Sequence, residues 1–291
     1  MSRICRPRRI TPGRPVIEGA GVHLKRAFGH DEAPAFDPFL LLDDFRSDRP
    51  DHYFKGFPWH PHRGIETITY MLDGSVAHGD SLGNTGIIGS GDVQWMTAGS
   101  GIVHQEMPKG DASGRMGGFQ LWANLPARHK MMAPRYQEIR REQIPEVLLD
   151  GGVRVKVVCG RVGAVQGPVA DIVTDPQYLD VIVPPRKQWA HSIQSGYTVL
   201  AYGVYGHGGF SGDAAFSSAQ NGNLVAFGEG DQIVAHAGDD AFRFLLVSGQ
   251  PIGEAVAWRG PIVMNTPEEL DLAFEEYREG TFVKHGSRGP K

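Results

Sequence analysis

Short apolar segments rich in β-branched and aromatic residues recur along the chain, and glycine or proline follows each of them within two residues. Clear examples run over residues 67–72, 153–158, 179–183 and 242–247. Segments of this length and composition are typical of β-strands. Because no helical pattern lies between them, they predict antiparallel sheets rather than alternating strands and helices. The expected fold class is therefore all-β, with the strands arranged in antiparallel β-barrels.

A single short helix is predicted near the C-terminus, over about residues 267–279. Thr266, followed by Pro267 and then Glu269, forms a capping box, which is a strong signal for a helix start. Apolar residues then recur at helical spacing, and Gly280 supplies a stop. We expect the apolar face of this helix to pack on a barrel.

Two blocks of the first half recur in the second half in the same order. The block 64–74 matches 196–206 at an offset of 132 residues, with both terminal glycines and a tyrosine in common. The Gly-Asp and Ala-Gly pairs within 91–99 match those within 230–238 at an offset of 139 residues. Repetition of this kind indicates two copies of one β-unit. The sequence therefore predicts two homologous barrels.

These two copies define the expected domains. The N-terminal barrel is assigned to residues 1–140, and the C-terminal barrel, with the helix at its end, to residues 141–291. The change from one barrel to the other is expected in the polar stretch 134–150.

The densest cluster of possible metal ligands lies at the start of the first repeated block. His60, His62 and Glu66 are separated by even numbers of residues, so in an extended strand their side chains project to one face. His104 and Glu106 repeat this arrangement farther along the chain. If both strands face the same barrel interior, His60, His62, His104 and Glu106 converge on one metal ion. Three neutral imidazoles and a carboxylate suit Fe(II), Mn, Ni, Cu or Zn, with positions left open for O₂ or Lewis-acid chemistry.

The composition argues against other kinds of site and partner. Cys5 and Cys159 are the only cysteines, so neither a thiolate metal site nor a disulfide framework is expected. The chain carries 29 Lys and Arg against 33 Asp and Glu, a net charge of −4, and we expect no direct binding to nucleic acid. No apolar stretch approaches the length of a membrane span. We therefore expect a cytoplasmic protein that does not contact membranes.

The second copy keeps the glycines and the tyrosine of the first but not its candidate ligands. With the offsets given above, His60 maps to Ser192, His62 to Gln194, His104 to Arg243 and Glu106 to Leu245. The metal site is therefore expected in the N-terminal barrel alone. It also follows that the barrel does not need these ligands in order to fold.

Several longer motifs closely resemble those of the pirin family of the cupin superfamily. The resemblance covers about residues 10–285 and rests on the segments 61–64, 80–84, 91–104, 118–122 with 124–126, and 260–261 with 264–266. It implies a bicupin, a chain of two jelly-roll-like barrels. In such proteins the N-terminal barrel holds one non-haem iron and the C-terminal barrel has lost its metal.

The resemblance also implies specific ligands. The family's metal ligands fall on His60, His62, His104 and Glu106, and the implied cofactor is Fe(2+). Glu106 is expected to serve in addition as the catalytic base for a substrate hydroxyl. Glu66 is expected beside the ligands, where it would orient an imidazole, although many cupins use a carboxylate at this spacing as a ligand.

Two activities are associated with this family. The first expectation is a dioxygenase of the quercetin 2,3-dioxygenase type, which cleaves a flavonol or another polyphenol with O₂. The alternative is an iron-dependent, redox-sensing regulator that binds a transcription factor or a metabolic enzyme. Phe57, Trp59 and Met71 are candidate substrate contacts near the barrel mouth. A monomer is expected, because two barrels in one chain already bury the surface that single barrels often bury by dimerising.

Overall fold

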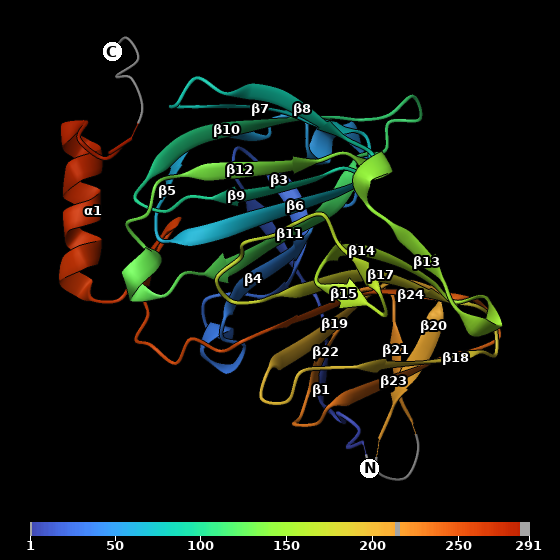
Figure 1. Cartoon of the computed structure of the whole chain (residues 1–291). Coiled ribbons are helices and arrows are strands. Elements are labelled where there is room, and N and C mark those ends of the chain that lie inside the picture. The colour runs from blue at the N-terminus through green and yellow to red at the C-terminus, as the bar shows by residue number, and fades with distance from the viewer. Residues whose placement is uncertain (1, 213–215, 286–291) are drawn as a thin grey trace. The chain divides into compact units, whose positions relative to one another are not determined.

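The computed structural model describes residues 2–212 and 216–285, and most of its regular structure is antiparallel β-sheet (Figure 1). The chain divides into two compact units. We call one of them the N-terminal barrel, residues 15–141 with 252–291, and the other the C-terminal barrel, residues 1–14 with 142–251. The predicted all-β class, with two barrels and one short helix, is confirmed.

The two ends of the chain belong to the opposite barrels from those predicted by the division into residues 1–140 and 141–291. The long segments do change over at residue 141, close to the expected boundary. However, β1 (Pro7–Pro12) pairs with β22 (Asn223–Phe227) and so belongs to the C-terminal barrel. Residues 252–291 belong instead to the N-terminal barrel. Each barrel is thus completed by a segment from the far end of the chain.

The N-terminal barrel is built from two sheets. The larger has the strand order β12-β9-β6-β11-β4-β3-β2, and the smaller has the order β5-β10-β7-β8. The strands of the larger sheet are β12 (Arg135–Ile139), β9 (Val93–Thr97), β6 (Ile65–Asp73), β11 (Gly117–Asn124), β4 (Phe39–Asp44), β3 (Val22–Phe28) and β2 (Arg14–Glu18). Those of the smaller are β5 (Phe57–His62), β10 (Ile102–Lys109), β7 (Ser75–Asp80) and β8 (Thr85–Gly89).

The C-terminal barrel has the same arrangement, strand for strand. Its larger sheet has the order β1-β22-β19-β24-β17-β14-β13, and its smaller sheet has the order β18-β23-β20-β21. The strands not yet given are β13 (Glu146–Leu148), β14 (Arg154–Cys159), β17 (Gln177–Val183), β18 (Gln188–Ser192), β19 (Thr198–Tyr205), β20 (His207–Ser211), β21 (Phe216–Gln220), β23 (Gln232–Ala237) and β24 (Phe242–Gly249). A small hairpin of β15 (Arg161–Val162) and β16 (Val165–Gln166) is added. The identical orders support the predicted duplication.

This correspondence confirms one repeated block and corrects the other. β6 and β19 hold the same place in their sheets, so the offset of 132 residues relates equivalent strands. The offset of 139 is wrong, because it relates the turn before β9 to the turn before β23, whose counterpart is β10. Arg243 consequently lies on β24 and is not the counterpart of His104 on β10. A Gly-Asp turn precedes many strands, so a match of this length does not fix the alignment.

The C-terminal segment of the N-terminal barrel contains a short hairpin and the predicted helix. β25 (Ala257–Arg259) pairs with β26 (Ile262–Met264), and α1 (Pro267–Glu279) follows. The helix begins with the expected capping box and ends at Gly280 in the left-handed conformation. Its buried face joins an apolar cluster with β26, as predicted. Short 3₁₀ turns lie at Ala33–Ala35, Pro50–His52, Ala127–His129, Arg141–Gln143 and Asp150–Gly152.

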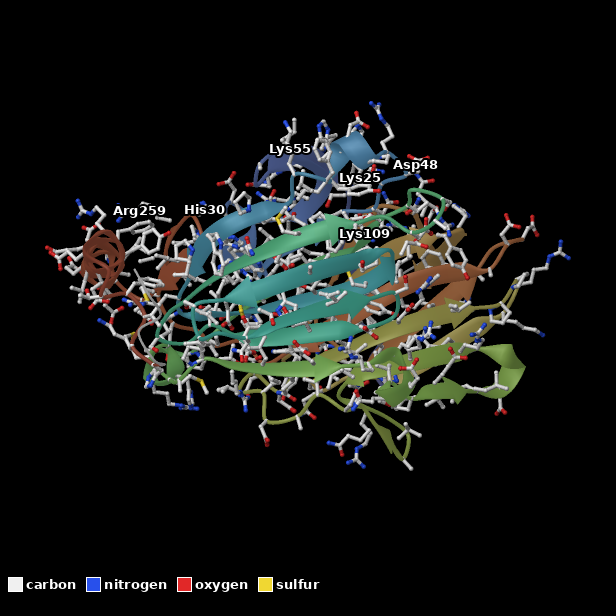
Figure 2. The ribbon with its side chains drawn as sticks, turned by 90° about the horizontal axis from the view of Figure 1, so that it is seen from above. Lys25, His30, Asp48, Lys55, Lys109 and Arg259 are labelled. Atoms are coloured by element: carbon white, nitrogen blue, oxygen red, sulfur yellow. The ribbon has the colours of Figure 1, made fainter. Side chains whose placement is uncertain are left out.

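Several lysine side chains are exposed on the N-terminal barrel. Figure 2 labels Lys25, Lys55 and Lys109 among them. In residues 2–212 and 216–285, no helix combines the length and the hydropathy that a membrane-spanning helix requires.

Candidate metal centre

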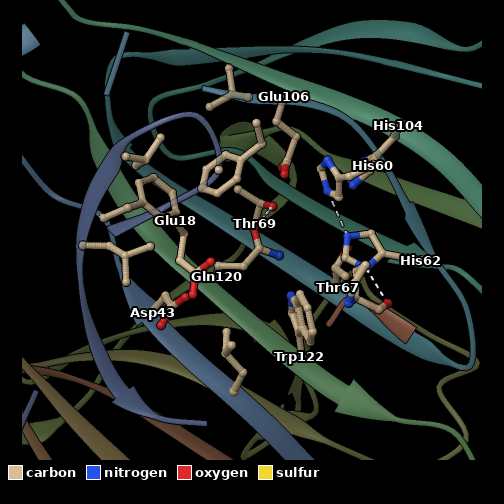
Figure 3. Close-up of a pocket in the computed structure, with 18 of the residues that line it drawn as sticks. Glu18, Asp43, His60, His62, Thr67, Thr69, His104, Glu106, Gln120 and Trp122 are labelled. Carbon is tan, nitrogen blue, oxygen red and sulfur yellow. Dashed lines mark hydrogen bonds between the residues drawn. The ribbon is translucent and has the colours of Figure 1, made fainter. Parts of the chain in front are cut away.

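Three histidines converge inside the N-terminal barrel. His60 and His62 lie two residues apart on β5, so their side chains share one face. β10 runs antiparallel beside β5 and places His104 directly opposite His60. The Nε2 atoms of His60 and His62 are 3.1 Å apart, and one nitrogen from each of the three rings lies within 4.8 Å of the others. Figure 3 shows the three rings gathered at one end of a cavity.

Backbone carbonyls hold two of these rings with the same nitrogen turned inward. His60 Nδ1 lies 2.8 Å from the carbonyl oxygen of Pro58, and His62 Nδ1 lies 3.1 Å from that of Pro261. A carbonyl oxygen only accepts, so Nδ1 carries the hydrogen in both rings and Nε2 keeps its lone pair. Histidine ligands of metal ions are usually oriented in this way.

His104 completes the donor set as a buried ring whose nitrogens are not hydrogen-bonded. Its residue exposure is 2%, and neither ring nitrogen has a hydrogen-bond partner among the residues that the structure describes. An unsatisfied buried polar atom costs about 1–3 kcal/mol, so such a ring is unusual unless something else binds it. Burial also holds the pKa values of His62 and His104 well below the ordinary histidine value. Both rings are therefore neutral, as metal ligands must be, and the residues fit a first-row transition metal ion.

Glu106 lies beside the three histidines but is not part of the tight cluster. It follows His104 by two residues on β10, after an irregularity in the pairing with β5. Its carboxylate points into the cavity near His60 (Figure 3), but it is not among the groups within 4.8 Å of one another. Burial raises the pKa of Glu106 to about 7, and the hydroxyl of Thr69 opposes this increase. The structure thus brings three of the four predicted ligands together and places the fourth within the same cavity.

Glu66 points away from the histidines, so the prediction that it shares their face is wrong. Gly64 adopts a φ of 77° between β5 and β6, which breaks the alternation between His62 and Glu66. Glu66 instead accepts a hydrogen bond of 2.7 Å from the hydroxyl of Thr97, with 1% of its surface exposed. The expected role in orienting an imidazole is carried out by backbone carbonyls.

The histidines line one end of a cavity of about 430 Å³. This volume lies in the usual range for small-molecule sites. Aromatic side chains flank the metal-binding end: the ring of Trp122 lies 5.1 Å from that of His62, and Trp258 lies 6.0 Å from Trp122. His30, which Figure 2 labels, continues this series at 5.2 Å from Trp258. Such a wall favours a planar aromatic ligand.

Polar groups occupy the middle and the far end of the same cavity. Thr69 on β6 donates a hydrogen bond of 2.9 Å to the side chain of Gln120 on β11. Arg26 lies at the far end and is held by both carboxylate oxygens of Asp43, at 2.9 and 2.8 Å, and by Glu18 at 2.9 Å. Figure 3 shows the carboxylates on the side of the cavity away from His62.

Only one of the three predicted substrate contacts lines the cavity. Phe57 does so, whereas Trp59 is 53% exposed and Met71 lies in the apolar core. Trp122 and Trp258 also line the cavity, and neither was predicted as a substrate contact. Alternation along β11 from the buried Gly118 could have indicated Trp122, but nothing in the local sequence indicates Trp258, which comes from β25.

Ionisation of Glu106 is expected to destabilise the metal-free protein. Its pKa lies above the ordinary carboxyl value, so its contribution to stability is fully present at low pH and is lost as the pH rises through 7. Glu106→Gln cannot ionise. We expect the Tm of the wild type to fall relative to that of the variant between about pH 5 and pH 8, measured with a chelator present. Other groups titrate in both proteins, so a constant difference in Tm would contradict this expectation.

Comparisons with known proteins agree with the two-barrel fold. The family described as Pirin matches residues 21–123, and the family described as Pirin C-terminal cupin domain matches residues 178–283. A Pirin-like protein of Caulobacter vibrioides is 46% identical over 94% of this chain and 98% of its own length. Pirin of Homo sapiens is 40% identical over 91% of this chain and 89% of its own. A crystal structure of quercetin 2,3-dioxygenase from Acinetobacter baumannii superposes with a TM-score of 0.87 at 29% identity, covering 96% of this chain and 99% of that one.

Proposed function

Because the chain belongs to the pirin family, we propose that its N-terminal barrel binds a single Fe(2+) ion and cleaves a flavonol or a related polyphenol with O₂. The proposed ligands are His60, His62, His104 and Glu106. The observation that carries the proposal is the meeting of three neutral imidazoles at the aromatic end of a cavity large enough for such a substrate. The structural similarity to a protein described as quercetin 2,3-dioxygenase supports the choice of reaction.

The donor set suits the proposed metal ion. Imidazole and carboxylate ligands that leave coordination positions open are typical of non-haem Fe(II) oxygenases, and a bound iron would supply the site for O₂ and for a substrate oxygen. The carbonyls of Pro58 and Pro261 fix the tautomers of His60 and His62, so these rings are oriented before the ion arrives.

The other residues of the cavity bind the substrate, and one of them removes a proton from it. Trp122 offers an aromatic face next to His62, and Gln120 with Thr69 offers a hydrogen-bonding pair farther along. Glu106 is the proposed base: its carboxylate projects into the cavity beside the histidines, where it can accept a proton from a phenolic or enolic hydroxyl.

The proposal is tested by loading the protein with Fe(II) without oxygen and then adding quercetin and O₂. We expect oxygen uptake and carbon monoxide release that depend on the metal, and neither of them with His62→Ala. Stoichiometric metal binding without turnover of flavonols or catechols would contradict the enzyme and would favour the iron-dependent regulator. Absence of metal binding in the wild type would contradict the metal centre itself.

Glu106→Gln separates metal binding from proton removal. An amide keeps the size of the side chain but cannot act as a base, so we expect kcat to fall by about 10²- to 10⁴-fold. The metal content should fall much less than in His62→Ala, because three imidazoles remain. Both quantities are measured on the same iron-loaded samples. An unchanged kcat would show that Glu106 is not the base.

A further inference from the structure

Lys130 is a fully buried cation close to the metal centre but outside its cavity. It follows the 3₁₀ turn Ala127–His129, and 1% of its surface is exposed. Its Nζ donates three hydrogen bonds: to the carbonyl oxygen of Gly64 at 2.9 Å, to the side-chain oxygen of Asn124 at 2.7 Å and to the carbonyl oxygen of Val263 at 3.1 Å. These three acceptors match the three hydrogens of an ammonium group.

Each of the three accepting residues comes two positions after His62 or after a residue that contacts the His62 ring. Gly64 comes two positions after His62 itself. Val263 follows Pro261, whose carbonyl accepts from His62 Nδ1. Asn124 follows Trp122, whose ring lies 5.1 Å from that of His62. One ammonium group therefore joins the three chain segments that surround this imidazole.

The three segments come from distant parts of the chain and meet at this point, where backbone hydrogen bonds such as that from Val263 to the carbonyl of Arg63 also join them. The turn after β5, the end of β11 and the strand β26 approach so closely that a Cβ on Gly64 would lie 1.9 Å from the carbonyl oxygen of Val263. Burial lowers the pKa of Lys130 to about 7, so keeping a lysine here has an energetic cost. An apolar side chain would fill the space without that cost, but would remove the donor that Lys130 supplies to each of the three oxygens.

We propose that Lys130 is a positioning residue for the metal centre. It fixes the His62 imidazole by hydrogen-bonding to three chain segments: the one that carries the ring, the one whose carbonyl orients it and the one that packs against it. The inference rests on the proposed metal site. Lys130 does not line the cavity, so it would touch neither a bound metal ion nor the substrate. It acts by keeping Nδ1 of His62 on the Pro261 carbonyl, which leaves Nε2 free to bind a metal ion.

The test compares Lys130→Met, which keeps the length of the side chain and removes its donors, with a matched control. Asp92 also makes three hydrogen bonds in this barrel, accepting from the backbone of Gly89 and Arg141 and from the side chain of Arg140, each at 2.9 Å. Because Asp92 lies outside the cavity, Asp92→Ala is expected to lower Tm without changing the metal site.

With Co(II) as the probe, we expect Lys130→Met to weaken binding by about 10- to 100-fold and to change the visible ligand-field spectrum, whereas Asp92→Ala changes neither. In the metal-free protein, the Nδ1 proton of His62 should give an NMR signal that exchanges slowly in the wild type and in Asp92→Ala. We expect its exchange to become at least about tenfold faster in Lys130→Met.

The two measurements distinguish the two proposals. If the wild type binds no metal, the metal centre is contradicted, but the exchange rate of the His62 proton still tests Lys130. If Lys130→Met retains the Co(II) affinity, the spectrum and the slow proton exchange, the positioning role is overturned. Should Lys130→Met not fold, Asn124→Leu removes only one of the three acceptors. We then expect a smaller change of the same sign in affinity and exchange, and no change would equally overturn the proposal.

Discussion

Replacing His104 by leucine is expected to abolish metal binding and, at the same time, to raise the Tm of the metal-free protein. Both ring nitrogens of His104 are buried without a hydrogen-bond partner in the described part of the chain, at a cost of about 1–3 kcal/mol that an apolar side chain of similar size avoids. A gain of about 1 kcal/mol corresponds to a shift of about 2–4 °C for a protein of this size. Calorimetric titration with Co(II) or Zn(II) measures the loss of metal binding, and thermal unfolding with a chelator present measures the rise in Tm.

His191→Leu in the C-terminal barrel is the matched control. That ring is partly buried as well, but its Nε2 lies 2.8 Å from the side-chain oxygen of Gln177 and its face stacks on Trp189 at 5.0 Å. We expect its loss to lower Tm and to leave metal binding unchanged. A fall in the Tm of metal-free His104→Leu comparable to that of His191→Leu would mean that His104 is retained for packing rather than for a metal ion.

Gly64→Ala is expected to be the most destabilising single substitution near the site. The added Cβ would lie 1.9 Å from the carbonyl oxygen of Val263, and the φ of 77° is unfavourable for alanine. Relief of the clash moves β26 and breaks the contacts of Val263 with Lys130 and of Pro261 with His62. We expect the free energy of unfolding to fall by more than about 4 kcal/mol and metal affinity to be lost.

Gly83→Ala separates the clash from the backbone effect. Gly83 has a φ of 90°, but a Cβ there would meet nothing within 4 Å. Only the conformational cost remains, about 1–2 kcal/mol, with metal binding intact. Urea unfolding of both variants gives the comparison. Equal losses of stability in the two would show that the contact with Val263 does not explain why position 64 is glycine.

The sequence predicted the elements of the fold better than their connections. Short apolar segments and the glycines or prolines that follow them identified the strands, and the capping box located α1 within one residue, because these signals are local. The exchange of chain ends was not predicted, because strand order in a sheet depends on pairings between segments far apart in sequence. The second repeated block failed for a related reason: a two-residue turn is too short to identify its strand.

In the candidate site, too, local features could be predicted and contacts between distant segments could not. The His-x-His pattern on β5 and His104 on β10 could be predicted, since alternation along a strand is sufficient to place them on one face. Glu66 could not be placed, because a single glycine turn separates it from His62. The contact between the Pro261 carbonyl and His62 could not be predicted either. Every residue carries a backbone oxygen, and only the fold brings this one to His62.

The position of Pro261 has a consequence for the order of events during biosynthesis. This residue emerges from the ribosome 199 residues after His62, when every strand of the C-terminal barrel has already been made. The N-terminal barrel therefore lacks β25, β26 and α1 until the end of synthesis, whereas all strands of the C-terminal barrel are synthesised before these elements. A nascent chain that stops before residue 252 would carry all four proposed ligands but not the carbonyl that orients one of them. Full metal affinity would then require the segment that contains Pro261, which would keep shorter nascent chains from retaining a metal ion.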